Sequence, residues 1–223
     1  MSRKIAGAIG GLLGLATLAA WAIAGPDGEL GPRAAGDRPT LALLTSLPLM
    51  FGERFGLDGG GSQALTRLEK RYKVIPIGVA DAASLERQHL LLMAHPRAQP
   101  AEALVELDQW VRDGGRVLLL ADPKLDWPSE RALGDKLRPP PAFADTGLLK
   151  HWGLDLEAPN LDSAASAGRL SGNKCGVSDD GLVAHCAVGR GQATVIADAD
   201  FMNSDQTEQL DLLVRELDQL ESR

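Results

Sequence analysis

Residues 89–123 read HLLLMAHPRAQPAEALVELDQWVRDGGRVLLLADP. An apolar run of strand length, Leu90–Met93, precedes a helical pattern, and a second apolar run, Val117–Leu120, follows it. Pro100 suits the first turn of that helix, and Gly114 suits the left-handed residue that ends it. Because strand, helix and strand follow one another directly, the stretch predicts a right-handed crossover between two parallel strands.

Apolar runs of the same kind occur elsewhere in the chain, at Leu41–Leu44, Val74–Ile77 and Thr194–Ala197. Their hydrophobicity is continuous rather than alternating, which is typical of strands that are covered on both faces. We therefore expect an α/β domain, a three-layer sandwich with a mainly parallel, flavodoxin-like sheet. A last helix is predicted by an apolar stripe made of Leu210, Leu213, Val214, Leu217 and Leu220.

The region from Asp126 to Arg169 fits this alternation least well. It contains Pro139-Pro140-Pro141 and a short helical pattern around Leu148-Leu149-Lys150. We predict that it is an insertion between elements of the sheet.

The N-terminal part of the chain differs from the rest. Residues 1–4 include Arg3 and Lys4, whereas residues 5–24 have no charge and are long enough to span a bilayer core of about 30 Å. The positive-inside rule then predicts a cytoplasmic N-terminus and places the remainder across the membrane. Residues 25–39 are rich in Gly and Pro, so we expect a flexible linker followed by an extracytoplasmic α/β domain over residues 40–223.

Ala22-Ile23-Ala24 also has the pattern of a signal cleavage site. Residues 5–24 are therefore either a transmembrane anchor in contact with membrane lipid or a signal peptide. Both alternatives export the domain. We expect a single-pass protein of the bacterial inner membrane with a periplasmic domain, or a secreted periplasmic protein if the chain is cleaved after Ala24.

The charge balance narrows the range of partners. The net charge is −7, and aromatic residues make up only 4% of the chain. Binding to nucleic acid needs clustered Lys and Arg, and single-strand binding also needs aromatic platforms. We therefore expect no nucleic-acid partner.

Cys175 and Cys186 are the only cysteines, and they flank the turn signal Ser178-Asp179-Asp180-Gly181. If the two flanking segments pair as antiparallel strands in an exported domain, the sulfurs should form a disulfide. A nucleophilic Cys186 with His185 as its base is disfavoured, because adjacent residues of a strand point to opposite faces. Two cysteines and one nearby His are too few ligands to predict a metal site.

Acidic residues follow several predicted strands, at the edge where open α/β sheets bind ligands. Our candidate ligand-binding residues at this edge are Glu53, His95, Asp122 and Asp200. If the chain is extended at Asp198 and Asp200, their carboxylates point to the same face and could act as a pair in metal binding or acid–base chemistry. Carboxylates at this edge also commonly cap loops and helices, so a purely structural role stays open. We expect no resident cofactor or metal.

Ser46 and His95 each follow a predicted strand and could act as a nucleophile and its base. However, neither G-x-S-x-G nor G-x-C-x-G occurs, so the sharp turn that exposes a nucleophile is absent from the sequence. We therefore predict no catalytic residue, and keep a hydrolase or amidotransferase-like enzyme with a non-standard nucleophile as the alternative.

Residues 89–123 resemble the core of the gliding-motility-type auxiliary proteins of ABC transporters, in which a helix ending in Asp-Gln-(aromatic)-Val leads through Gly-Gly to a strand closing with Asp-Pro. Residues 189–201, GRGQATVIADADF, are similar to the final strand of that family. The resemblance implies a class I glutamine-amidotransferase-like domain that generally lacks the catalytic Cys. It also implies an extracytoplasmic, non-catalytic component beside ABC transporter permease and ATPase subunits. Family members are often larger and carry a C-terminal membrane helix, whereas the apolar span of this chain is N-terminal.

Overall fold

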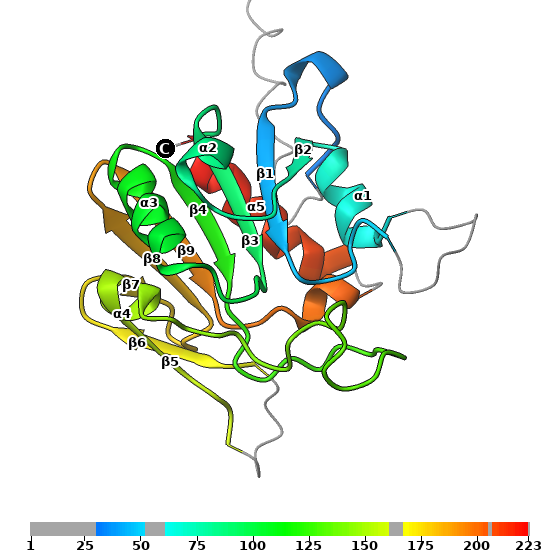
Figure 1. Cartoon of the computed structure of the whole chain (residues 1–223). Coiled ribbons are helices and arrows are strands. Elements are labelled where there is room, and N and C mark those ends of the chain that lie inside the picture. Colours follow the sequence, from blue (N-terminus) through cyan, green and yellow to red (C-terminus); the bar gives the residue numbers. More distant parts are fainter. Residues whose placement is uncertain (1–29, 52–60, 161–166, 205–206, 223) are drawn as a thin grey trace, which may run out of the picture. The chain divides into compact units, whose positions relative to one another are not determined.

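The computed structural model describes residues 30–51, 61–160, 167–204 and 207–222 of the chain. Its central sheet has seven strands in the order β2-β1-β3-β4-β9-β8-β7 (Figure 1). The first five strands in this order, β2, β1, β3, β4 and β9, run parallel to one another. They are β1 (Thr40–Thr45), β2 (Lys73–Pro76), β3 (Leu90–Ala94), β4 (Arg116–Leu120) and β9 (Gly191–Ile196). The mixed α/β architecture with a mostly parallel sheet that the sequence predicted is therefore confirmed.

Both faces of the sheet are covered by helices, which explains the continuous apolar runs of the strands. Leu43, Leu92 and Leu118 belong to one buried cluster, and their sequence neighbours Leu44, Leu91 and Leu119 belong to the cluster on the other face. In Figure 1 helices α2 and α3 lie in front of the sheet and α5 lies behind it. The helices are α1 (Gln63–Glu69), α2 (Ala82–Leu85), α3 (Ala101–Arg112), α4 (Leu148–Trp152) and α5 (Thr207–Ser222).

Helix α3 forms where the sequence predicted it. Pro100 precedes its first residue, and Asp113 follows its last. Gly114 then adopts a φ of 115°, a left-handed conformation that L side chains rarely adopt. The turn returns the chain to the sheet at Arg116, opposite Leu90 in the parallel register. The β-α-β unit predicted from residues 89–123 is therefore present.

The far end of the sheet is antiparallel. β7 (Gly176–Val177) pairs with β8 (Val183–Val188), and β8 pairs with β9. Gly181 closes the β7–β8 turn with a φ of 75°. These strands extend the parallel sheet beyond the part that apolar runs alone had indicated.

The predicted insertion, residues 126–169, leaves the carboxyl end of β4 and crosses below the sheet in Figure 1. It contains α4 and the strand β5 (Leu154–Glu157). β5 pairs with β6 (Arg169–Gly172) in a separate two-stranded antiparallel sheet. Leu148, Leu149 and Trp152 of α4 are buried in the same cluster as the apolar face of α3.

The chain enters the domain at the amino edge of the sheet. Residues 31–38 of the predicted linker pack against the domain and belong to the same compact unit. The Arg33 N–H donates to the Lys70 carbonyl, and the Arg33 guanidinium lies 5.1 Å from the centre of the Tyr72 ring. A short 3-10 helix, η1 (Ala35–Asp37), then leads into β1.

Within the described residues, no helix is both long and apolar enough to span a membrane. The predicted anchor, residues 5–24, and the cytoplasmic residues 1–4 lie outside the described residues, as does the first part of the predicted linker.

Candidate functional site

The carboxyl ends of β1 and β3 meet where the strand order reverses, since β1 has β2 on one side and β3 on the other. Open α/β sheets bind ligands at such a point. Ser46 follows β1, and its hydroxyl donates to the carbonyl oxygen of His95 at 2.5 Å. The neighbouring Thr45 hydroxyl donates to the Ala94 carbonyl at 2.8 Å. Both hydroxyls therefore tie the end of β1 to the end of β3.

His95 is fully buried and has a φ of 47°, the one non-glycine residue with a positive φ in the described part of the chain. Its N–H donates to the Leu120 carbonyl at 3.1 Å, and its Nε2 lies 3.0 Å from the Pro140 carbonyl oxygen. Burial lowers the pKa of His95, although the Pro140 carbonyl opposes this shift. The ring is therefore neutral and donates from Nε2, which fastens the insertion to the sheet.

The ring of His95 is not arranged to activate Ser46. Nδ1 is buried, and in the described residues it has no hydrogen-bond partner. The Ser46 hydroxyl contacts the His95 backbone and not its ring. A general base must lie within hydrogen-bond reach of the proton that it removes. The observed hydrogen bonds disfavour a Ser46–His95 pair as a nucleophile and base.

Three carboxylates gather farther along the same edge, beyond β4 and β9. One oxygen from each of Asp122, Asp198 and Asp200 lies within 4.8 Å of the others. Asp122 accepts hydrogen bonds from the N–H groups of Lys124, at 2.8 Å, and Ala199, at 3.0 Å. Asp198 accepts from the Asp200 N–H at 2.8 Å. The bonds from Lys124 and from Asp200 each close a local backbone turn, whereas the bond from Ala199 joins the chain beyond β4 to the chain beyond β9.

Burial is the main cause that raises the pKa of all three carboxyls above their ordinary values. Hydrogen bonds from backbone N–H groups to these carboxylates lower their pKa values and so oppose the effect of burial. The negative charge of a neighbouring carboxylate raises the pKa further: Asp200 raises that of Asp122, and Asp122 raises that of Asp198. The oxygens suit a hard cation such as Mg²⁺ or Ca²⁺. However, both Asp122 oxygens already accept backbone N–H bonds, so a local turn and a link between the ends of β4 and β9 give this residue a structural role without a metal.

The predicted ligand-binding residues are only partly brought together. Asp122 and Asp200 lie in the same cluster, and Asp198, noted as a possible carboxylate partner of Asp200, completes it. His95 lies at the same edge, but its ring bonds to Pro140. Glu53 lies outside the described residues. Ligand binding by these four residues stays a prediction.

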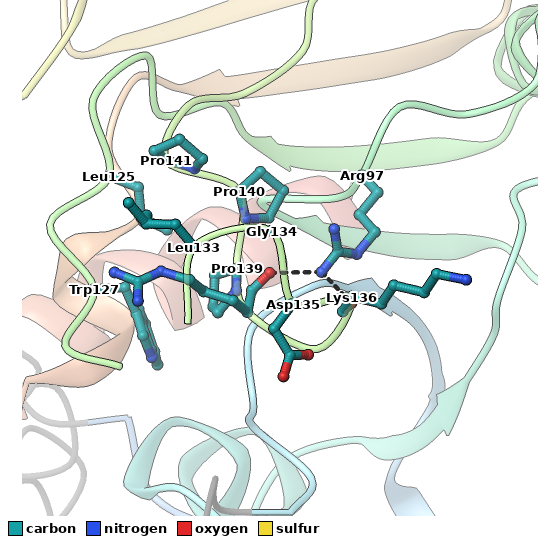
Figure 2. Close-up of a pocket in the computed structure, with 11 residues that line it drawn as sticks. Arg97, Leu125, Trp127, Leu133, Gly134, Asp135, Lys136, Pro139, Pro140 and Pro141 are labelled. Carbon is teal, nitrogen blue, oxygen red and sulfur yellow. Dashed lines mark hydrogen bonds between the residues drawn. The ribbon is translucent and has the colours of Figure 1, made fainter. Parts of the chain in front are cut away.

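Two cavities of about 380 Å³ each adjoin this edge, and the sequence did not indicate either. The first lies among residues of the insertion, where Figure 2 shows the Arg97 guanidinium reaching the backbone of the loop. Arg97 donates to the carbonyl oxygens of Lys136 and Arg138, both at 2.6 Å. The second cavity lies between the ends of β1 and β2. Its apolar walls include Leu43, Leu47, Met50, Phe51, Ile77 and Leu137.

No sequence signal would have identified these cavities, because their lining combines residues that follow four strands with residues of the insertion. Arg97 and Lys136 line both of them. Neither residue belongs to a recognisable motif.

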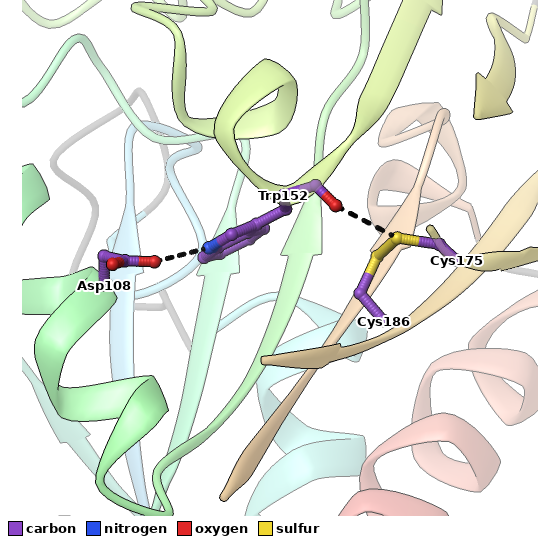
Figure 3. The surroundings of a disulfide bond; sticks show 4 residues. All are labelled: Asp108, Trp152, Cys175 and Cys186. Atoms are coloured by element: carbon purple, nitrogen blue, oxygen red, sulfur yellow. Dashed lines mark hydrogen bonds between the residues drawn. A yellow bond between two sulfur atoms is a disulfide. The ribbon is translucent and has the colours of Figure 1, made fainter. Parts of the chain in front are cut away.

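The predicted disulfide is present at the antiparallel end of the sheet. Cys175 and Cys186 are joined, with their Cα atoms 4.4 Å apart, directly beyond the Gly176–His185 pair of the β7–β8 ladder. Figure 3 shows the bridge beside Trp152, whose indole N–H donates to Asp108 at 2.9 Å. His185 points elsewhere, and its Nε2 lies 2.8 Å from a Glu216 oxygen on α5. This confirms that His185 does not serve Cys186 as a base.

Comparison with known proteins gives one family. A sequence profile described as "ABC-type uncharacterized transport system", of the ABC transporter auxiliary type, matches residues 38–169. No curated protein sequence matches the chain.

Comparison with solved structures also gives matches at low sequence identity. The N-terminal domain of mmIFT52 is similar over 83% of this chain and 98% of its own, with 14% identity and a TM-score of 0.54. A cytoplasmic protein from Salmonella typhimurium matches 81% of this chain and 98% of its own, with 12% identity and a TM-score of 0.47. An exo-β-1,4-mannosidase from Opitutaceae bacterium strain TAV5 is similar over 81% of this chain and 36% of its own, with 14% identity and a TM-score of 0.45. At 14% identity the likeness to the mmIFT52 domain shows the fold and nothing about function.

Proposed function

The chain belongs to the ABC transporter auxiliary family, and from that premise we propose that it is a non-catalytic binding and scaffolding domain, tethered to a membrane beside transporter subunits. Residues 5–24 would hold the domain at the membrane as a single span, with the N-terminus in the cytoplasm and the domain on the other side. Its partners would be the permease or ATPase subunits of an ABC-type system. The domain would contribute binding surfaces rather than chemistry.

The arrangement of Ser46 and His95 is the observation that carries the non-catalytic part of this proposal. The hydroxyl donates to a backbone carbonyl, and the imidazole is buried and bonded to Pro140. Both cysteines of the chain are joined in the disulfide, so neither is available as a nucleophile. A class I glutamine-amidotransferase-like scaffold used in this way would retain the fold without a reacting group.

The disulfide supports the extracytoplasmic placement. Such bonds persist in oxidising compartments such as the periplasm and are rare in the cytosol. A domain exported by residues 5–24 would form the Cys175–Cys186 bond in its working compartment.

The tether is tested by fractionation and N-terminal sequencing of the tagged full chain. The proposal expects the chain in the membrane fraction with Met1 or Ser2 at its N-terminus, and expects added protease to digest the domain only from the extracytoplasmic side. A soluble chain that begins at Gly25 would show a cleaved signal and contradict the tether. Cytoplasmic digestion of the domain would contradict the predicted orientation.

The rival function is a hydrolase or amidotransferase-like enzyme. It is tested with Ser46→Ala and Asp200→Asn in the full chain, by comparing ester and amide hydrolysis with that of the wild type. The proposal expects no hydrolysis above the background rate for any of the three proteins. Turnover by the wild type that either substitution abolishes would support the enzyme.

A further inference from the structure

The two cavities adjoin each other at the carboxyl edge of the sheet. Arg97 and Lys136 line both, so the turn that contains Lys136 separates them. Hydrogen bonds from Arg97 to the carbonyls of Lys136 and Arg138 hold this turn against the loop that follows β3. Neither cavity is lined by the carboxylate cluster of Asp122, Asp198 and Asp200. The pair of cavities is a second, separate feature of this edge.

Exposed apolar side chains concentrate around the same cavities. In the described part of the chain, four large hydrophobic residues are strongly exposed: Phe51 at 74%, Val105 at 69%, Leu133 at 86% and Leu137 at 60%. Phe51 and Leu137 line the second cavity, and Leu133 lines the first. Val105 alone lies elsewhere, on α3. Exposed apolar groups gathered around a hollow are typical of a surface that binds a partner.

The lining carries positive charge, although the chain as a whole has a net charge of −7. Its basic residues are Arg97, Arg131, Lys136 and Arg138, and its acidic residue is Asp135. Asp135 lies 3.6 Å from Arg131. The Lys136 side chain is exposed and has no partner among the described residues. The lining of the two cavities therefore favours an anionic ligand over a cationic one.

The position of the cavities favours a protein over a lipid surface. The chain enters the domain at the amino edge, where the Arg33 N–H donates to the Lys70 carbonyl, and η1 lies at the end of β1 opposite to the loops of the insertion (Figure 1). A tether that pulls on residues 31–38 therefore leaves the cavities at the other end of the strands. Two neighbouring hollows also suit an extended chain, which places alternate side chains in successive pockets.

We propose that these two cavities bind an extended segment of a partner protein that carries acidic residues between two apolar side chains. The apolar side chains would enter the hollows on either side of the Lys136 turn. The acidic groups would lie against Arg97 and Lys136. This inference deepens the proposed scaffolding function, on which it rests, by assigning the binding surface and the chemistry of the segment that it recognises.

The test uses the full chain and dye-labelled synthetic peptides of about twelve residues, followed by fluorescence anisotropy. One peptide alternates Glu and Leu, a second replaces Glu by Lys, and a third replaces Leu by Ser. The protein variants are Lys136→Glu and Leu137→Ser. Lys73→Glu is the matched charge control at the amino edge, and Val105→Ser is the matched control for an exposed apolar residue.

The proposal expects the Glu-Leu peptide to bind most tightly, and expects Lys136→Glu to weaken that binding by about tenfold or more. Leu137→Ser should also weaken it, whereas Lys73→Glu and Val105→Ser should leave it unchanged. Equal binding of the Glu-Leu and Lys-Leu peptides would overturn the proposal. The proposal would also be overturned if Lys136→Glu bound the Glu-Leu peptide as tightly as the wild type does. It would likewise be overturned if the wild type bound phosphatidylglycerol vesicles but none of the peptides, and Lys136→Glu reduced that vesicle binding.

Failure of this test is distinguishable from failure of the proposed function. Crosslinking to transporter subunits that survives Lys136→Glu would overturn the assigned surface while retaining the scaffold. A chain that binds the acidic peptide but crosslinks to no transporter subunit would retain the surface and contradict the ABC partnership.

Discussion

Asp218 joins the entry segment of the chain to helix α5, and its replacement by Ala should destabilise the domain. Its carboxylate accepts a hydrogen bond from the Tyr72 hydroxyl at 2.5 Å and contacts Arg33 at 3.0 Å. It also pairs with Arg71, which donates a further hydrogen bond to the Gly31 carbonyl. Burial, and next the hydrogen bond to Asp218, raises the pKa of Tyr72, so its hydroxyl remains a donor at neutral pH.

The cost of Asp218→Ala follows from the partners that remain. Tyr72 is 1% exposed, so its hydroxyl would lose its acceptor inside the protein, at a cost of about 1–3 kcal/mol. Arg71 would keep Gly31, and Arg33 would keep Glu221 at 2.7 Å, so the two guanidinium groups would lose only part of their interactions. We expect a total loss of about 3 kcal/mol, which lowers the melting temperature of a domain of this size by about 6–12 °C.

The assay is urea unfolding of the full chain followed by circular dichroism, with limited proteolysis at Arg33 and Arg38 as a second readout. Asp155→Ala is the control, because its pair with Lys150 is exposed and should contribute less than about 1 kcal/mol. Asp218→Ala should also accelerate cleavage in residues 31–38. A free energy of unfolding for Asp218→Ala within about 0.5 kcal/mol of the wild-type value would show that Asp218 does not stabilise the domain.

Further predictions concern the disulfide and the carboxyl edge. Replacing both Cys175 and Cys186 by Ser should lower the free energy of unfolding by about 3 kcal/mol, measured against wild type without reductant, and an unchanged value would contradict a structural role. The pKa of the Asp200 carboxyl is raised in the folded protein, so the folded protein binds the carboxyl proton more tightly than the unfolded chain does. At neutral pH this carboxyl is ionised and therefore lowers the stability of the fold. Asp200→Asn should therefore be more stable than wild type near neutral pH and lose this advantage below about pH 4 in pH-dependent melts; the opposite trend would exclude the raised pKa. Ser46→Ala should cost about 1 kcal/mol of stability in urea unfolding through the lost bond to His95, and an unchanged free energy of unfolding would contradict that bond's role.

Several elements could be predicted because their signals are local. The apolar runs at Leu90–Met93 and Val117–Leu120 and the cap at Gly114 lie within one crossover, so periodicity and turn chemistry were sufficient. The disulfide also followed from a local pattern, since the turn at Ser178–Gly181 sets the cysteines opposite each other.

Other features depend on contacts between distant parts of the chain, which no window of sequence contains. The packing of residues 31–38 on the domain depends on Asp218, far away in α5. The bond from His95 to Pro140 and the cavities beside Lys136 depend on where the insertion folds back over the sheet. Glycine and proline content had indicated only a linker and an irregular insertion there.

At the carboxyl edge of the sheet, too, the sequence predicted which residues lie together but not the contacts that they make. The strand ends predicted that Asp122 and Asp200 would lie together, and they do. The backbone N–H groups that Asp122 engages come from the local turn at Lys124 and from Ala199 beyond β9, and the sequence did not reveal either contact.

The proposed partnership with ABC transporter subunits is tested by crosslinking of the full chain in native membranes, followed by affinity purification and mass spectrometry of the crosslinked peptides. The chain without residues 5–24 serves as the control. We expect to recover ABC transporter permease or ATPase peptides with the full chain, and fewer of these peptides with the control. Recovery of no transporter subunit with the full chain would contradict the proposed partnership.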